Sequence, residues 1–186
     1  LFSIMRTRSF WLAVGATSAR TLYGFAISFV AGVAAGIAAG RSRRVDAALS
    51  PVITVIRTVP VMAVILLAMI WFRTDTVPVF VCFLMIFPII TANVRQGVIG
   101  VSSRLLEMSR AYKLSRSDEL TQIVVPSIVP YILSGLKSGI GIAWKSVIAA
   151  EVLSQPLRAI GTGLQFSQMN LETAEVMAWT VVAILF

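Results

Sequence analysis

The sequence contains no histidine, a single cysteine and few charged residues. Only 13% of its 186 residues are charged, and 16 lysines and arginines stand against 8 acids. Without histidine the commonest metal ligand and acid–base group is missing, and the lone Cys82 can close no internal disulfide. No carboxylates cluster within the apolar stretches. We therefore expect no catalytic residue, no metal site and no cofactor in this chain, which disfavours an intramembrane enzyme.

Apolar residues make up 58% of the chain, more than in ordinary soluble domains. Five segments are long or apolar enough to span a bilayer, which requires about 20 helical residues. They are 21–40, 45–72, 77–98, 126–153 and 173 onward. Kinks are common at prolines in such helices, and four lie in or near these segments: Pro51, Pro60, Pro88 and Pro130. We expect residues 1–186 to form one all-α transmembrane domain, part of a longer protein with one further helix upstream.

The net charge of +8 is distributed according to membrane topology. The basic residues lie between membrane segments and form no aromatic-rich basic face, so we expect no nucleic-acid partner. Lysine and arginine favour cytoplasmic loops, and they gather after the first and third segments. These residues are Arg41, Arg43, Arg44, Arg95, Arg104, Arg110, Lys113 and Arg116. Both loops are predicted to lie inside and residues 1–18 outside, with a short interfacial helix over 9–18 anchored by Trp11.

Small residues recur at every fourth position of the first segment, at Gly24, Ser28, Gly32, Gly36 and Gly40. Such a stripe lets another helix approach backbone to backbone. We expect a helix of the same subunit there, and a dimer interface is the alternative. The pattern returns as Gly135-x-x-x-Gly139 in the fourth segment.

Four charged residues, Arg57, Lys137, Lys145 and Glu151, lie within predicted spans. A central charge there costs about 2.5 to 3.5 kcal/mol on insertion scales, so each should face protein or water. Arg57 and Lys137 can instead snorkel to the cytoplasmic interface. Glu151 can also meet lipid headgroups or an external binding protein.

A polar-to-small stripe runs along the fourth span at helical spacing, through Ser134, Ser138, Gly141 and Lys145. It could line a translocation path, with Arg57, Ser138, Lys145 and Glu151 as the candidate path residues. The alternative pairs Lys145 with an acidic residue of a neighbouring helix, in a structural role.

The stretch 107–126 is a charged island between apolar runs. A helix over about 103–114 would place Leu105, Met108 and Tyr112 on one face, suited to pressing into a groove of a soluble partner. Ser115-x-x-Asp118 fits a capping box that opens a second helix toward Pro126. The alternative is a solvated amphipathic loop with the ion pairs Arg104–Glu107 and Glu107–Arg110.

The spacing of Glu107, Ile123 and Pro126 resembles the cytoplasmic EAA loop of ABC importer permeases. That loop reads Glu-Ala-Ala, three residues, glycine, nine residues, isoleucine, any residue and Leu-Pro. The chain departs from it at Met108, Ser109, Lys113 and Val125. Further motifs are similar to the nitrate, sulfonate and taurine branch of these permeases. They are Ser18-x-Arg20-Thr-Leu-x-Gly24-Phe25, Arg57-Thr-Val-Pro60, Trp71-Phe72, Phe87-Pro88 with Asn93 and Gly97, Pro126-x-x-x-Pro130-Tyr-Ile-Leu-x-Gly135, Ala149-Ala-Glu151 and Gly161-Thr-Gly163-Leu164, with departures at Leu66 and Arg73.

This resemblance implies a type I ABC importer permease bundle in the bacterial cytoplasmic membrane. It implies a cytoplasmic coupling loop at about 102–124 that contacts an ATPase through Glu107, Met108, Ser109, Arg110, Ala111, Tyr112, Lys113 and Leu114. The implied partners are a second permease copy, two ATPase subunits that hold ATP and magnesium, and an external binding protein. The implied substrates are nitrate, bicarbonate, sulfonates such as taurine, or a pyrimidine-type vitamin precursor. An ATP-independent secondary transporter or channel is the alternative.

Overall fold

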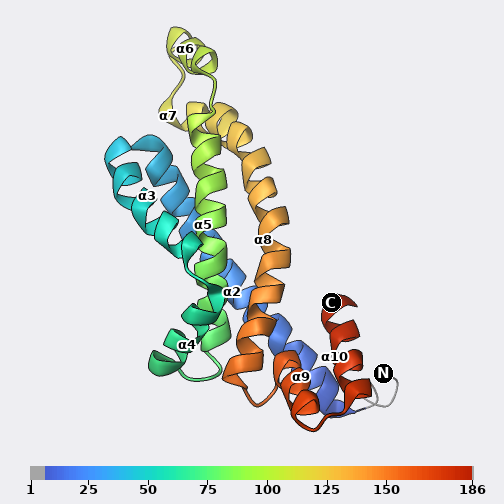
Figure 1. Cartoon of the computed structure of the whole chain (residues 1–186). Coiled ribbons are helices and arrows are strands. Elements are labelled where there is room, and N and C mark those ends of the chain that lie inside the picture. The colour runs from blue at the N-terminus through green and yellow to red at the C-terminus, as the bar shows by residue number, and fades with distance from the viewer. Residues whose placement is uncertain (1–6, 186) are drawn as a thin grey trace. The chain divides into compact units, whose positions relative to one another are not determined.

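The computed structural model describes residues 7–185, and every regular element in this range is helical (Figure 1). The elements are α2 (Arg8–Arg41), α3 (Arg43–Thr58), α4 (Val61–Trp71), α5 (Val77–Ile99), α6 (Ser103–Ala111), α7 (Arg116–Glu119), the π-helix η1 (Leu120–Val124), α8 (Val125–Ser154), α9 (Ile160–Met169) and α10 (Thr173–Leu185). The chain divides into two compact units. The first unit comprises residues up to 27, 59–85 and 141 onward, and the second comprises 28–58 and 86–140. The predicted all-α fold is confirmed.

Within residues 7–185, three helices are long and apolar enough to cross a membrane. They are α2, α5 and the continuous stretch Arg116–Ser154, which contains α7, η1 and α8. They correspond to the first, third and fourth predicted spans. The fifth predicted span begins with α10, whose 13 residues extend about 20 Å, less than the roughly 30 Å of hydrocarbon.

The second predicted span, 45–72, is two helices rather than one. The chain leaves helical conformation before Pro60, whose φ of −60° and ψ of 129° precede the first turn of α4. Proline has no N–H and disfavours helical conformation in the residue before it, so the break at Val59 follows from the sequence. Together α3 and α4 qualify as one broken span or a re-entrant loop.

The separate interfacial helix predicted over 9–18 is wrong, because these residues form the first turns of α2. The helix runs without interruption for 34 residues. Gly15 is the one glycine within residues 9–18, and a single glycine in a helix costs only about 1 kcal/mol relative to alanine. No proline lies between Arg8 and Arg41 to end the helix.

The glycine stripe of α2 packs against α5 of the same chain, which confirms the expected contact with a helix of the same subunit. In the first unit, a Cβ added at Gly24 would lie 2.7 Å from Cβ of Cys82. In the second unit, one added at Gly36 would lie 2.7 Å from Cβ of Val94 and 2.8 Å from the carbonyl oxygen of Thr91. Comparably close contacts recur at Gly32 with Ile90 and at Gly40 with Val98. These positions therefore require glycine for the close approach of the two helices.

Two apolar clusters form the core of the first unit. One joins α4, α5 and α8 through Ile65, Ala68, Val77, Val81 and Ala150. The other joins α2, α9 and α10 through Phe10, Val14, Ile160 and Val182. The Trp144 indole donates a 2.8 Å hydrogen bond to the Ala183 carbonyl, which fixes α10 to α8. These contacts hold α9 and α10 beside the N-terminal end of α2 (Figure 1).

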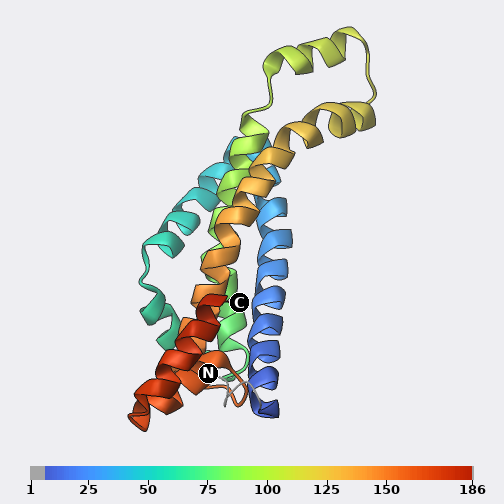
Figure 2. The same ribbon diagram turned by 90° about the vertical axis from the view of Figure 1, so that its right-hand side faces the viewer.

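In the second unit, an ion pair joins the first turn of α3 to α5. The Arg95 guanidinium donates through both Nε and Nη2 to the Asp46 carboxylate, with Nη2 2.6 Å from Oδ2. The Tyr131 ring packs onto Gly97, so that α8 approaches α5 closely. Figure 2 shows α6 and α7 projecting as a hairpin beyond the adjacent ends of α5 and α8. This hairpin contains the charged island of the sequence.

Candidate functional site

The hairpin presents an exposed apolar face on α6. Leu105, Met108 and Tyr112 have exposed fractions of 39%, 44% and 77%. The predicted helix over about 103–114 is confirmed as α6, which ends at Ala111 with Tyr112 as its C-cap. Large apolar side chains at three- and four-residue spacing form one stripe on a helix. The stripe is uncovered in the isolated chain and is therefore available to a soluble partner.

Two polar contacts hold the hairpin in shape. The buried Ser109 hydroxyl lies 2.7 Å from Oε2 of Glu119 and 2.9 Å from the Leu106 carbonyl oxygen, which ties α6 to α7. The predicted capping box is confirmed, because the Asp118 N–H donates to the Ser115 hydroxyl at 3.1 Å. These contacts fix the conformation of the hairpin that presents the apolar face.

Lys113, between α6 and α7, has a φ of 51°, in the left-handed region. Lys113 stands at the position where the EAA loop of ABC importer permeases carries glycine. A residue with a Cβ pays about 1 to 2 kcal/mol in this conformation, whereas glycine adopts it freely. Lys113 therefore adopts a left-handed backbone conformation that glycine would adopt at lower cost.

The other predicted docking residues lie on the surface of the same hairpin. Glu107, Arg110, Ala111 and Leu114 are exposed. Among the residues that the structure describes, Glu107 forms no ion pair with Arg104 or Arg110, so the pairs of the solvated-loop alternative are absent. The assignment of these residues to ATPase contact stays a prediction.

A π-helical turn connects the hairpin to the spanning helix α8. The Val125 N–H donates to the Leu120 carbonyl, a five-residue step, and the next residue, Pro126, has no N–H to donate. The Ser127 hydroxyl donates to the Ile123 carbonyl at 2.6 Å, so a side chain satisfies this acceptor near the break. The predicted second helix toward Pro126 is confirmed, and it continues into α8.

The candidate path residues differ in their surroundings. Arg57, Ser138 and Lys145 are exposed, as are Ser134 and Gly141, so the polar-to-small stripe of α8 is uncovered. Within residues 7–185, Lys145 forms no ion pair. Glu151 lies six residues further along α8, on a different face, and is fully buried. The path assignment stays a prediction for all four residues, and the contacts of Glu151 favour a structural role.

Glu151 is the centre of a buried charge cluster in the first unit. Its Oε1 accepts a 2.9 Å hydrogen bond from Nη1 of Arg20, and its Oε2 accepts one of 2.9 Å from the Thr17 hydroxyl. Arg20 also donates to the Arg158 carbonyl at 2.8 Å and pairs with Asp75 at 2.8 Å. Arg20 is 13% exposed and Asp75 63%, so the pair with Glu151 is the desolvated one.

The same cluster caps α9, whose own N-cap residue, Ala159, supplies no side-chain bond. The Ile160 N–H donates to the Thr17 hydroxyl at 3.0 Å, and the Gly161 N–H donates to Glu151 at 3.3 Å. A Cβ on Gly161 would lie 2.6 Å from the Ile148 carbonyl oxygen. We name the set Thr17, Arg20, Asp75, Glu151, Arg158 and Gly161 the clasp. It fastens α2, α8 and the start of α9 together.

Sequence reasoning identified Glu151 but missed its partners. The motifs Ser18-x-Arg20, Ala149-Ala-Glu151 and Gly161-Thr-Gly163 each pointed to a family, and the structure brings residues of all three into the clasp. The signal that could have paired them is charge, because Arg20 and Glu151 are opposite charges near the predicted outer ends of their spans. Within residues 7–185, no three His, Cys, Asp or Glu side chains gather as metal ligands. The absence of a cofactor stays an expectation.

Long apolar helices joined by short polar connections, with a projecting amphipathic hairpin, define a multi-pass, all-α membrane protein of the cell membrane. The chain belongs to the family of binding-protein-dependent transport system inner membrane components, whose model matches residues 28–186. Its similarities place it in the nitrate, sulfonate and taurine branch of the ABC importer permeases.

Three relatives illustrate this branch. The chain is 38% identical over 148 residues to the nitrate import permease protein NrtB of Leptolyngbya laminosa, covering 78% of this chain and 52% of that protein. It is 30% identical over 153 residues to the bicarbonate transport system permease protein CmpB of Synechococcus elongatus, covering 82% and 55%. It is 30% identical over 169 residues to the taurine transport system permease protein TauC of Escherichia coli, covering 90% and 61%. The chain thus spans about half the length of the curated relatives it matches.

Proposed function

We propose that this chain forms the transport pathway of an ATP-driven importer and couples it to a cytoplasmic ATPase through the hairpin of α6 and α7. The pathway is completed by a second copy of the chain, two ATPase subunits drive it, and an external binding protein delivers the substrate. ATP and magnesium bind in the ATPase subunits. The observation that carries this proposal is the exposed apolar face of α6 in a hairpin that the Ser109–Glu119 hydrogen bond holds in shape, in a chain of this family.

Tyr112 gives the sharpest test of ATPase docking. It is 77% exposed in the isolated chain, so an Asp there leaves the fold intact. In a docked complex the new carboxylate would be buried against an apolar groove, which costs several kcal/mol if it is left unpaired. We expect Tyr112→Asp to reduce co-purification of the ATPase at least tenfold, while the permease still inserts in the membrane.

The matched control is Ser117→Asp, which adds the same charge to an exposed position of the same hairpin, outside the apolar face. Co-purification should be unchanged in this variant. Equal ATPase retention by both variants would contradict docking through Tyr112 and favour the solvated-loop alternative.

We further propose that the exposed stripe of α8 faces the translocation path and that the substrate is a small anion. The relatives carry names of nitrate, bicarbonate and taurine transport systems. Lys145, exposed and without an ion pair among the described residues, could donate hydrogen bonds to an oxyanion that leaves its water behind. A pyrimidine-type vitamin precursor is the other substrate class, and its carbonyl and ring-nitrogen acceptors suit the same donor.

Lys145→Met removes the charge and keeps the length of the side chain. We expect this variant to abolish uptake without loss of assembled complex, and the control Lys137→Met, also exposed on α8, to keep most of it. Loss of the complex itself in Lys145→Met would indicate a structural ion pair within the assembled importer. Unchanged uptake would exclude both roles.

A further inference from the structure

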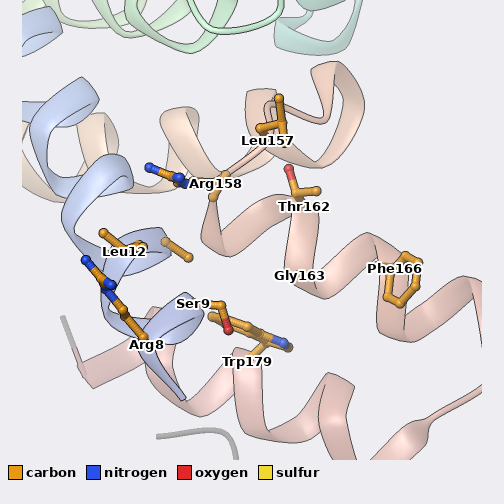
Figure 3. Close-up of a pocket in the computed structure, with 11 residues that line it drawn as sticks. Arg8, Ser9, Leu12, Leu157, Arg158, Thr162, Gly163, Phe166 and Trp179 are labelled. Atoms are coloured by element: carbon orange, nitrogen blue, oxygen red, sulfur yellow. The ribbon is translucent and has the colours of Figure 1, made fainter. Parts of the chain in front are cut away.

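A pocket of about 690 Å³ opens in the first unit, where the start of α2 meets α9 and α10. Figure 3 shows its wall, with Leu12 of α2, Phe166 of α9 and Trp179 of α10 as the large apolar side chains. Leu157, in the connection between α8 and α9, is 95% exposed at its edge. Pockets of roughly 300 to 1,000 Å³ accommodate small organic ligands. The proposed transport function makes no use of this pocket.

Two arginines, Arg8 and Arg158, also line the pocket. Within residues 7–185, neither guanidinium has an acidic side chain within ion-pair distance. The contact of Arg158 with Arg20 uses the backbone carbonyl of Arg158, so the Arg158 guanidinium stays available. Two cationic groups beside an apolar wall suit an occupant with an anionic head and an apolar stem.

The opposite charge lies in the adjoining cavity of about 370 Å³, which shares Phe166 and Trp179 with the pocket. Glu175 lines that cavity and accepts a hydrogen bond from the Ser167 hydroxyl at 3.2 Å. Its hydrogen bond with Glu172 and its negative charge raise the pKa of Glu172 above the usual value. An anionic head is therefore favoured at the arginine end alone.

The length of α2 favours a position for the pocket at the level of the lipid headgroups. Arg8 begins α2, a candidate span whose 34 residues extend about 51 Å, longer than the hydrocarbon core of roughly 30 Å. The ends of α2 therefore reach the headgroup layers. Trp11, 53% exposed, lies one turn into the helix, and tryptophan is enriched at this interface.

We propose that this pocket binds an acidic phospholipid of the leaflet that meets the N-terminal end of α2, which the predicted topology makes the outer one. The headgroup phosphate is held by the guanidiniums of Arg8 and Arg158. The upper part of an acyl chain packs on Leu12, Phe166 and Trp179. A phospholipid accounts for both the charge and the apolar wall, whereas a free inorganic anion accounts for the charge alone.

The test uses the full-length permease assembled with its partner subunits, in nanodiscs of phosphatidylcholine with increasing phosphatidylglycerol. Native mass spectrometry measures the phosphatidylglycerol that stays bound. One basic residue near a charged membrane surface changes binding about fivefold, so Arg8→Gln with Arg158→Gln should weaken retention about thirtyfold. The control Arg73→Gln removes an exposed arginine that does not line the pocket and should retain the lipid fully. The double substitution to lysine keeps both charges and should restore most of the binding.

Four results would overturn the proposal. Equal phosphatidylglycerol retention by the double glutamine variant and the wild type would show that the arginines do not hold it. Displacement of the lipid by inorganic phosphate at comparable concentration would identify a free-anion site. If the double glutamine variant retained the lipid but associated more weakly with the external binding protein, the arginines would be assigned to an acidic protein partner. Failure of both the glutamine and the lysine variants to assemble, with thermal midpoints far below wild type, would make the arginines structural and would equally contradict the lipid site.

Discussion

Removal of Arg20 should damage this protein more than removal of any other charge in the clasp. The Glu151 side chain is fully buried, and Arg20 is its only cationic partner among the described residues. In Arg20→Met the carboxylate keeps the Thr17 and Gly161 donors but loses its compensating charge. Breaking a buried pair in this way costs about 3 to 5 kcal/mol.

The other members of the clasp should be less sensitive, each for a reason visible in the structure. In Glu151→Met the guanidinium keeps Asp75 and the Arg158 carbonyl and reaches solvent, so the cost should be about 1 to 3 kcal/mol. Asp75 is 63% exposed, and Asp75→Asn should cost about 1 kcal/mol or less. The double variant Arg20→Met with Glu151→Met leaves no stranded carboxylate, so it should be more stable than Arg20→Met alone.

The lone Cys82 provides the assay. It is buried in α5 of the first unit, against Gly24 of α2, so a thiol-reactive fluorescent dye labels it only after that unit opens. Full-length permease with any cysteine outside residues 1–186 replaced by alanine is heated with the dye. Midpoint temperatures should fall in the order wild type, Asp75→Asn, Glu151→Met, Arg20→Met. The buried-pair reasoning would be refuted if the midpoint temperature of the double variant fell by at least the sum of the falls in Arg20→Met and Glu151→Met.

The remaining predictions concern helix contact, loop conformation and topology. Gly36→Ala would place a Cβ 2.8 Å from a backbone oxygen of α5 and should cost about 1 to 3 kcal/mol in thermal unfolding of the purified permease followed by circular dichroism, whereas Gly141→Ala meets nothing within 4 Å and should be neutral or stabilising. Lys113→Gly should stabilise the hairpin by about 1 kcal/mol or less and slow its cleavage by protease, because glycine adopts the left-handed conformation freely; faster cleavage would contradict this. Ser115→Cys in a Cys82→Ser background should react with an impermeant thiol probe in inside-out vesicles and not in intact cells, and labelling from outside would reverse the topology.

Local chemistry explains most of what the sequence predicted correctly. Long, mainly apolar segments predict α5 and α8, because their length and mean hydropathy suffice without knowledge of neighbouring helices. The capping box at Ser115 is a contact over three residues, and it forms as its spacing predicts. The small-residue stripe around Gly36 predicted close contact with a helix of the same subunit, and α5 makes that contact.

The misses concern features that depend on distant partners or on competing local signals. Glu151 binds Thr17 and Arg20, which lie 134 and 131 residues away in the chain, so no local pattern connects them. Trp11 favoured a separate interfacial helix over 9–18, although no residue there breaks a helix, and these residues form the start of α2. The break at Pro60 could have been predicted from proline's missing N–H, but the apolar run on both sides suggested one span.

The central claim is that this chain conducts a small solute only when an ATPase drives it. Proteoliposomes containing the full-length permease and its ATPase, supplied with the external binding protein and labelled nitrate, bicarbonate or taurine in turn, test it directly. Our account predicts uptake that requires ATP on the ATPase side and that is lost in Tyr112→Asp. Uptake at the same rate without ATP or without the ATPase would contradict it and identify a secondary transporter or channel.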